Sequence, residues 1–257
     1  MKTESKREID QLFEQKPYVF AHRGAMGYEI ENTLESFRKA LEMRVGLETD
    51  VRMTKDKELV CFHDKSFKID GKWYSVRSCT LQELRCCDFQ DDRYIPTINE
   101  VFREFQYCSI LRYSIDIGNT RVGKRLIKTA NQFGVLDRIE ITDTRLRVLK
   151  KLRKFNKKVK LVHTVPHIIQ KINEDNIDFA QLKKLNIGTL NIQNTRAKEE
   201  NFRNIIENGF DCYVWGVNRS VWMKRILKLR HNGEFVRAIY SNYPDKLKKL
   251  RKKYFPS

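Results

Sequence analysis

The chain has 257 residues, 40% of them hydrophobic and 11% aromatic, which is enough to fill the core of one large domain or two small ones. No apolar run reaches the roughly 18 to 20 residues of a membrane span, and the polar first residues lack the apolar segment of a secretory signal; we therefore expect a cytoplasmic protein. The formal charge of +18, from 51 Lys and Arg against 33 Asp and Glu, favours anionic partners such as phosphate esters.

The first predicted element is an amphipathic helix over residues 1–16, with Ile9, Leu12 and Phe13 on one face. From residue 18 onward, strand-like apolar runs alternate with helix-like segments. The predicted strands lie near residues 18–22, 45–51, 58–62, 110–117, 137–141, 159–164, 187–191, 211–216 and 236–240, and the predicted helices near 33–44, 80–87, 97–106, 120–133, 144–155, 177–185, 197–208, 219–230 and 245–253.

This alternation predicts a single α/β domain over residues 17–257, preceded by the helical extension 1–16. Repeated β-then-α units give parallel strands joined by right-handed crossovers. When residues 45–62 are counted as one unit with an additional hairpin-like strand, eight βα units remain. That number closes a (β/α)8 TIM barrel, which needs about 250 residues.

Local signals predict several boundaries. Asn32, followed three residues later by Glu35, is typical of a capped helix start. Thr97 and Asp143 are plausible caps for the helices that follow them. The polar segment 64–79 is predicted to be a loop beside the site, forming a rim over the substrate.

The six cysteines show no CxxC pair and no regular spacing, and no export signal accompanies them. We therefore expect free, partly buried thiols rather than disulfides at Cys61, Cys79, Cys86, Cys87, Cys108 and Cys212.

Polar side chains gather at the ends of the first predicted strands. Glu48 and Asp50 are two residues apart on one strand, so their carboxylates share a face. Two such carboxylates repel each other unless a cation lies between them, and hard oxygen ligands suit Mg²⁺ or Ca²⁺; exposed acids in salt bridges are the alternative. His22 and His63 each end a strand and are candidates for an acid and a base about this centre.

Other residues complete the candidate site. Arg23 offers a planar donor fork suited to phosphate. Asp116, at the end of a later strand, is a third metal ligand, a helix N-cap or a charge at the barrel rim. Trp215 is either a core residue or a wall for an apolar or sugar-like group, and Asn218 is either a helix cap or a ligand contact.

Taken together, these motifs resemble the glycerophosphodiester phosphodiesterase family. The resemblance spans nearly the whole domain, in the order His22-Arg23-Gly24, Glu31-Asn32-Thr33, Glu48-x-Asp50, His63-Asp64, Trp215-x-x-Asn218 and the closing segment 239–244. It implies a barrel that hydrolyses a glycerophosphodiester to glycerol 3-phosphate and an alcohol with a divalent metal. His22 and His63 would be the acid/base pair, Arg23 a phosphate contact, and Glu48 and Asp50 metal ligands.

The sequence departs from the family pattern in three places. The family usually has Glu-x-Lys where this chain has Asp116-Ile117-Gly118, so the acid is shorter and the lysine that would touch phosphate is absent. Near the end, Ser241-Asn242 replaces the usual Thr-Asp. The His pair and the first two acids are unaffected.

Three alternatives stay open beside hydrolysis of a small soluble diester. The substrate could be a lysophospholipid, as in a lysophospholipase D, or a glycerophosphate polymer; or the barrel could have lost catalysis and bind an anion. Nucleic acid is not expected, because no aromatic-basic interleaving is present. The basic segment 246–253 is best explained as the closing barrel helix, with weak contact to an anionic membrane as the alternative. The sequence does not give the oligomeric state.

Overall fold

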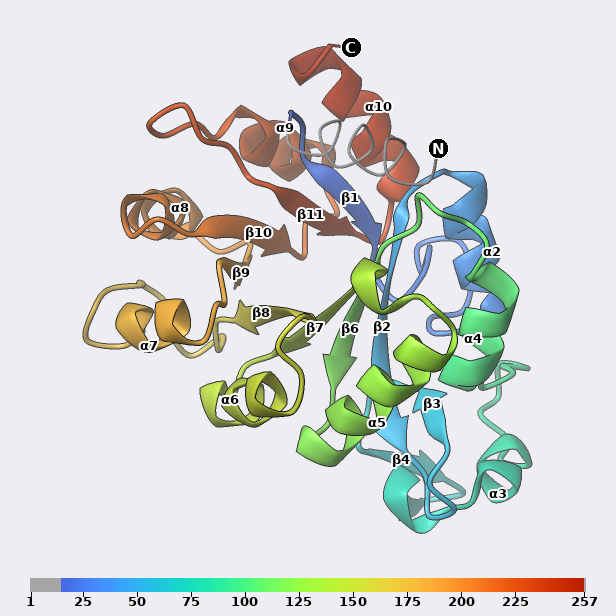
Figure 1. Ribbon diagram of the computed structural model, residues 1–257. Coiled ribbons are helices and arrows are strands. Elements are labelled where there is room, and N and C mark those ends of the chain that lie inside the picture. The colour runs from blue at the N-terminus through green and yellow to red at the C-terminus, as the bar shows by residue number, and fades with distance from the viewer. Residues whose placement is uncertain (1–14, 257) are drawn as a thin grey trace.

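The structure, a computed structural model, describes residues 15–256. Its centre is a closed barrel of parallel strands (Figure 1). β1 pairs with β2 on one side and with β11 on the other, and this closes the sheet. Around the barrel the eight strands are β1 (Tyr18–Ala21), β2 (Gly46–Met53), β6 (Tyr113–Ile117), β7 (Ile139–Asp143), β8 (Lys160–Thr164), β9 (Thr189–Gln193), β10 (Asp211–Trp215) and β11 (Ala238–Ser241). The predicted (β/α)8 fold is confirmed.

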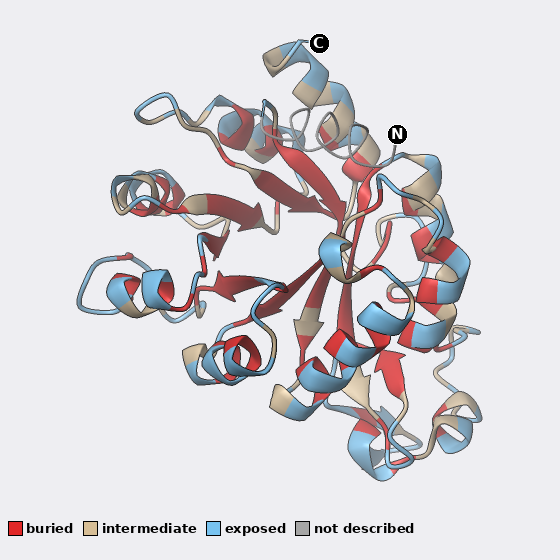
Figure 2. Ribbon diagram, viewed as in Figure 1, coloured by how far each residue is buried: buried red, intermediate tan, exposed pale blue. Residues whose placement is uncertain are grey.

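Helices surround the barrel, and each barrel strand is followed by one of them (Figure 1). Their outer faces are exposed while the strands are almost wholly buried (Figure 2). The outer helices are α2 (Leu34–Glu42), α4 (Ile98–Phe105), α5 (Thr120–Gln132), α6 (Leu146–Phe155), α7 (Phe179–Lys184), α8 (Lys198–Glu207), α9 (Ser220–Lys228) and α10 (Pro244–Tyr254). The helix predicted over residues 1–16 lies almost entirely outside the described residues.

An insertion follows β2 and carries the predicted additional strand. β3 (Leu59–Cys61) runs antiparallel to β2, and the short helix α3 (Leu81–Arg85) comes later in the insertion. The prediction of a loop over 64–79 is wrong, because β4 (Ser66–Ile69) and β5 (Lys72–Ser75) form a two-stranded hairpin. Asp70 and Gly71 both have positive φ, as a two-residue hairpin turn requires. The buried Phe67 packs this hairpin against Phe62.

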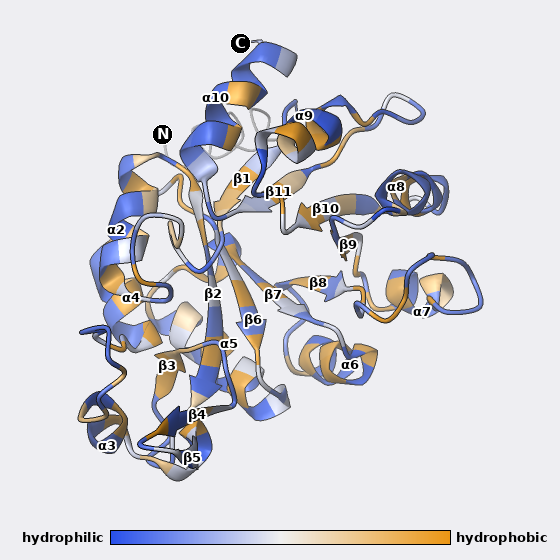
Figure 3. Ribbon diagram, turned by 180° about the vertical axis from the view of Figure 1, so that it is seen from behind, coloured by the Kyte–Doolittle hydropathy of each residue, from blue (hydrophilic) through white to orange (hydrophobic). Residues whose placement is uncertain are grey.

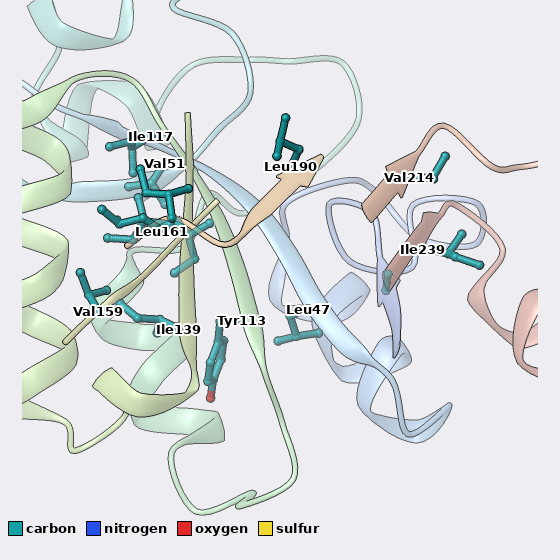
Figure 4. Close-up of a cluster of buried hydrophobic side chains, with 14 of the residues drawn as sticks. Leu47, Val51, Tyr113, Ile117, Ile139, Val159, Leu161, Leu190, Val214 and Ile239 are labelled. Atoms are coloured by element: carbon teal, nitrogen blue, oxygen red, sulfur yellow. The ribbon is translucent and has the colours of Figure 1, made fainter. Parts of the chain in front are cut away.

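Side chains alternate across each strand of the barrel wall. Leu47 and Val51 of β2 belong to the apolar layer between strands and helices, together with Ile117 of β6 (Figure 4). Glu48 and Asp50 lie between them on the strand and therefore point to the opposite side, into the barrel. The same alternation appears as mixed hydropathy along the barrel strands, seen from behind in Figure 3.

A charged network around the buried Glu140 lies toward the N-terminal end of the barrel. Its carboxylate pairs with Arg112 and with Lys160, and it accepts a hydrogen bond from Tyr213 Oη at 3.0 Å. Burial favours the neutral acid, yet these two cations lower the pKa of Glu140 overall. Arg112 directly precedes β6, Lys160 begins β8 and Glu140 is the second residue of β7. Because these charged residues lie away from the end that carries the catalytic candidates, we interpret the network as structural.

The helix caps are only partly as predicted. Thr97 caps α4 as expected. The cap of α2 is Thr33 rather than Asn32, and its reciprocal partner is Ser36 rather than Glu35. Asp143 caps no helix; it ends β7 and its carboxylate accepts from the backbone and the guanidinium of Arg145.

All six cysteines lie in the described part of the chain and are free thiols, as predicted. Among the helices of residues 15–256, none combines the length and the apolar character needed to cross a bilayer.

Candidate active site

The predicted site residues come from segments at the carboxyl ends of neighbouring strands. His22 and Arg23 directly follow β1, and Glu48 and Asp50 lie in β2. Asp116 of β6 is in register with Asp50. Since β1, β2 and β6 are adjacent in the barrel, these side chains converge at one end of it.

The turn after β1 requires the residue types found there. Arg23 and Gly24 both have positive φ, 51° and 75°. A Cβ on Gly24 would lie 2.2 Å from Ser36 Oγ, so only glycine fits between the turn and helix α2. This tight turn directs the backbone N–H of Arg23 at Glu48, where it donates to Oε2 at 2.7 Å.

His22 is held by a residue from the far end of the chain. Its Nδ1 lies 2.9 Å from Asn242 Oδ1, and the backbone N–H of Asn242 donates to Asn218 Oδ1 at 2.8 Å. An amide oxygen only accepts, so Nδ1 carries the proton and Nε2 is left as an acceptor. This Nε2 lies 3.9 Å from Glu48 Oε2. Burial, with the positive charge of Arg23, lowers the pKa of His22.

Arg23 and Asn32 bind the acids of the site. The guanidinium of Arg23 donates to Glu31 Oε2 at 2.8 Å, and its Nε lies 3.4 Å from Asp50 Oδ2. The buried Asn32 accepts from Thr49 Oγ1 and from the backbone N–H of Asp50, and donates to Asp50 Oδ2 at 3.3 Å. Glu31 and Asn32 of the predicted motif thus orient the arginine and the metal-ligand candidate.

Three carboxylates, those of Glu48, Asp50 and Asp116, face the same end of the barrel, and the neighbouring cations do not offset their mutual repulsion. Burial and the neighbouring Asp50 raise the pKa of Glu48 well above its usual value. Burial, with the charges of Asp50 and Asp143, raises the pKa of Asp116 to about 7. Oxygen donors that repel each other in this way are the type that Mg²⁺ or Ca²⁺ binds.

The donor chemistry therefore fits a hard cation, although the side chains do not form a ready coordination shell. Among the described residues, no three His, Cys, Asp or Glu side chains are grouped closely enough to hold a metal ion. Glu48 Oε2 is engaged by the Arg23 backbone, and Asp50 Oδ2 by Asn32. Metal binding would need these carboxylates to turn toward a common centre.

His63 lies after β3, at the start of the insertion, and its side chain is 41% exposed. Its Nδ1 lies 2.8 Å from Asp64 Oδ1, and its backbone carbonyl accepts a hydrogen bond from Arg52 Nη2. The second predicted histidine is thus also held through Nδ1.

Trp215 ends β10 and packs against an aromatic cluster inside the barrel that includes Phe20, Tyr213 and Tyr240. Its indole Nε1 is buried and has no hydrogen-bond partner among residues 15–256. Asn218 is not a cap, because the cap residue of α9 is Arg219. It holds the backbone of Asn242, which in turn holds His22.

Comparison with known proteins identifies the family. The model of the glycerophosphoryl diester phosphodiesterase family matches residues 22–246. This chain belongs to that family. The resemblance seen in the motifs is therefore confirmed, and membership places the chain among phosphodiesterases that act on glycerophosphodiesters.

Individual relatives of the phosphodiesterase agree with this. YhdW of Bacillus subtilis is 28% identical over 244 residues, covering 89% of this chain and 95% of that protein. The glycerophosphodiester phosphodiesterase of Caldanaerobacter subterraneus is 30% identical over 162 residues, or 57% of this chain and 65% of that protein. A solved phosphodiesterase of Oleispira antarctica, in complex with the product sn-glycerol 3-phosphate, has a TM-score of 0.74 at 19% identity and covers 91% of this chain and 96% of its own.

Sequence reasoning missed two side chains of the candidate site. Asn242 was noted only as a departure from the family pattern, whereas it is the partner of His22. Arg52 lies two residues beyond Asp50 on the same face of β2 and contacts the backbone of His63. The two-residue period from Glu48 through Asp50 was the signal that could have identified Arg52.

Proposed function

We propose that this phosphodiesterase hydrolyses glycerophosphodiesters to glycerol 3-phosphate and an alcohol, with His22 and His63 transferring the protons. The observation that carries this proposal is that both imidazoles are held in the same way, through a contact of Nδ1 with a side-chain oxygen. Each is held through Nδ1, by Asn242 or by Asp64, so that each offers Nε2 to a substrate. Two oriented histidines beside a carboxylate cluster form a general acid/base arrangement.

The environments of the two histidines support different roles. The lowered pKa of His22 keeps its imidazole neutral near pH 7, so its Nε2 can accept the proton of the attacking hydroxyl, from water or from the substrate's glycerol. His63 beside the Asp64 carboxylate is suited to donate a proton to the leaving alkoxide. With water as the nucleophile, this step gives glycerol 3-phosphate directly and leaves His22 charged and His63 neutral, and exchange with water restores both. With the glycerol hydroxyl as the nucleophile, the step gives a cyclic phosphate, which water then opens with the two histidines in reversed roles.

Other residues would bind the substrate. Arg23 lies among the acids with donors suited to a phosphate, and the unpartnered indole N–H of Trp215 faces the barrel interior. Glu48, Asp50 and Asp116 would hold a divalent cation, Mg²⁺ or Ca²⁺, which when bound supplies positive charge that stabilises the developing charge on the phosphate. A cytoplasmic location and contact of α10 with an anionic membrane stay predictions.

Turnover of glycerophosphocholine, measured as glycerol 3-phosphate released with and without EDTA, tests the proposal. We expect release that EDTA abolishes and that added Mg²⁺ or Ca²⁺ restores. Lysophosphatidylcholine is assayed in parallel, and activity on the lipid alone would indicate a lysophospholipase D. No turnover of either substrate with metals supplied would contradict the proposed hydrolysis and favour an anion-binding barrel.

A second candidate substrate, a glycerophosphate polymer, is favoured by a basic groove outside the barrel. The groove has a volume of about 980 Å³ and is lined by Lys57, Arg121, Lys124, Arg125, Lys128 and Lys151, with Met53, Thr120 and Phe155. No acid lines it, and none of these six cations forms an ion pair with a side chain of residues 15–256.

The position of the groove suits a chain of phosphodiesters. Arg121 lies three residues after Gly118, so the groove starts beside the carboxyl end of β6 and continues along α5. Cations one helical turn apart on α5 are about 5 to 6 Å apart along its axis, which is comparable to the repeat of a glycerophosphate chain. Repeated phosphates could therefore be bound while one diester occupies the active site.

The triple variant Lys124→Gln, Arg125→Gln, Lys128→Gln tests this candidate. We expect it to raise KM for glycerophosphate oligomers about tenfold or more and to leave KM for glycerophosphocholine within twofold. The matched control is Lys249→Gln, Lys252→Gln, Lys253→Gln on α10, which removes the same charge from exposed positions of another helix. Equal effects of both variants, or none with the groove variant, would contradict a polymer site. Reduced binding of the α10 variant to anionic vesicles would support membrane contact.

A further inference from the structure

Arg52 is a cation beside the carboxylate cluster that forms no ion pair with the described residues, although its charge acts on the nearby Asp116. Arg23 is paired with Glu31 and Asp50, and Arg145 with Asp143. Arg52 has no carboxylate within salt-bridge distance among the described residues, and its Nε is buried without a hydrogen-bond partner. A partly buried guanidinium that forms no ion pair is unusual, because burial disfavours an unpaired charge. An anionic substrate would supply the missing partner.

The contacts of Arg52 leave donors for such a partner. Nη1 donates to its neighbour's carbonyl, Val51 O, at 3.2 Å, and Nη2 donates to His63 O. A guanidinium has five N–H groups, so donors remain after these two bonds. The two bonds also fix the plane of the guanidinium between β2 and the segment that carries His63.

The absence of a side chain at Gly118 leaves room for the side chain of Arg52. β2 and β6 are paired up to Val51 and Ile117, which brings Arg52 alongside Gly118. A Cβ on Gly118 would lie 3.4 Å from Arg52 Cδ and 3.6 Å from its Nη1. The arginine side chain therefore extends across the position from which a side chain at residue 118 would project. A single Cβ is tolerated at these distances, whereas a longer side chain would share its space with the guanidinium.

We propose that Arg52 binds the phosphate of the substrate, from β2, at the place where Gly118, directly after β6, provides no side chain. This inference rests on the proposed function, since it assumes that a phosphodiester is bound beside Asp116 and His63. The planar fork of arginine matches two phosphate oxygens. Arg52 would thus hold the phosphate from one side of the acidic cluster and Arg23 from another.

Four variants separate phosphate binding from a role in holding His63. They are Arg52→Lys, Arg52→Gln, the double variant Arg52→Gln with Gly118→Lys, and the control Arg103→Gln at an exposed position of α4. The first measurement is the Kd of glycerol 3-phosphate by calorimetry, which needs no turnover. The second is kcat and KM for glycerophosphocholine.

We expect Arg52→Gln to raise both the Kd of glycerol 3-phosphate and KM by roughly 10- to 100-fold, the range for a lost charged hydrogen bond. Arg52→Lys should have an intermediate effect, because lysine keeps the charge without the fork. The double variant should recover at least tenfold in Kd, since a lysine at residue 118 extends into the vacated space. Arg103→Gln should change neither value by more than twofold.

Other results would overturn the inference. An unchanged Kd with Arg52→Gln, or a lower kcat that lysine at residue 118 does not rescue, would make Arg52 a positioning residue for His63. Thermal unfolding of each variant shows whether a loss of affinity or activity reflects misfolding. If Arg52→Gln does not fold, the Kd of glycerol 3-phosphate for the folded Arg52→Lys protein decides between the two roles. If the wild-type protein turns over no diester but binds glycerol 3-phosphate through Arg52, the proposed hydrolysis fails while the assignment of Arg52 stands.

Discussion

Replacing His22 or His63 by alanine is expected to lower kcat for glycerophosphocholine by roughly 10²- to 10⁴-fold, the usual contribution of a general acid or base. Each substitution removes one of the two imidazoles that Asn242 and Asp64 orient. The double variant should be little worse than the more damaged single variant, because both groups act in one step. Steady-state kinetics with glycerol 3-phosphate release as the readout measures this.

His231→Ala is the matched control, since His231 pairs with Glu207 outside the site. Near-full activity of both site variants would show that the proton-transfer assignment is wrong. The pH profile adds a check on the roles. Burial and the charge of Arg23 lower the pKa of His22. The acidic limb of the kcat/KM profile should therefore have its midpoint at a pH below about 6.5, the ordinary pKa of histidine. Only below that limb would the proposed base become protonated.

Asp116→Asn is expected to abolish most activity and at the same time stabilise the metal-free protein at pH 8. Burial, Asp50 and Asp143 raise the pKa of Asp116 to about 7 from its ordinary value of 3.8. The carboxylate is therefore ionised at pH 8 in an environment that disfavours the charge. The difference between these two pKa values corresponds to an upper limit of about 4 kcal/mol, and we expect a gain of roughly 1 to 3 kcal/mol in the free energy of unfolding.

The sign of the pH dependence follows from the raised pKa. The folded protein holds the Asp116 proton more tightly than the unfolded chain does, so this contribution to stability is full below pH 3.8 and is lost as the pH rises to about 7. The advantage of the Asn variant should therefore be several degrees in Tm at pH 8 and should shrink toward pH 4.

Thermal unfolding in EDTA at the two pH values measures this, with the exposed Asp175→Asn as the control. Added Mg²⁺ or Ca²⁺ should narrow the gap at pH 8, because a cation that binds the wild-type carboxylates stabilises the folded state. A gap that is the same at pH 4 and pH 8 would contradict the raised pKa, and one that metal does not change would argue against Asp116 as a ligand.

The sequence by itself determined the architecture and most of the catalytic candidates. The alternation of apolar runs and helical segments predicted the eight βα units, because parallel strands need a crossover helix between them. The two-residue period of Glu48 and Asp50 placed both acids inside the barrel, and the strand-end positions of His22 and Asp116 brought them to one end. These inferences depend only on local period and chain order. The hairpin around Asp70-Gly71 could also have been predicted from sequence, because Asp-Gly is a preferred pair in two-residue hairpin turns.

Only the tertiary structure decided which side chains act together. Asn242 holds His22 across 220 residues, a pairing that arises because β11 closes the barrel against β1. Likewise, Arg52 is recognised as a cation that forms no ion pair with the described residues only once β2, β6 and the His63 segment are placed around it. Sequence spacing fixes the direction of a side chain on its own strand. Its partners, and the charge left unbalanced among them, depend on which strands and loops the closed barrel brings into contact.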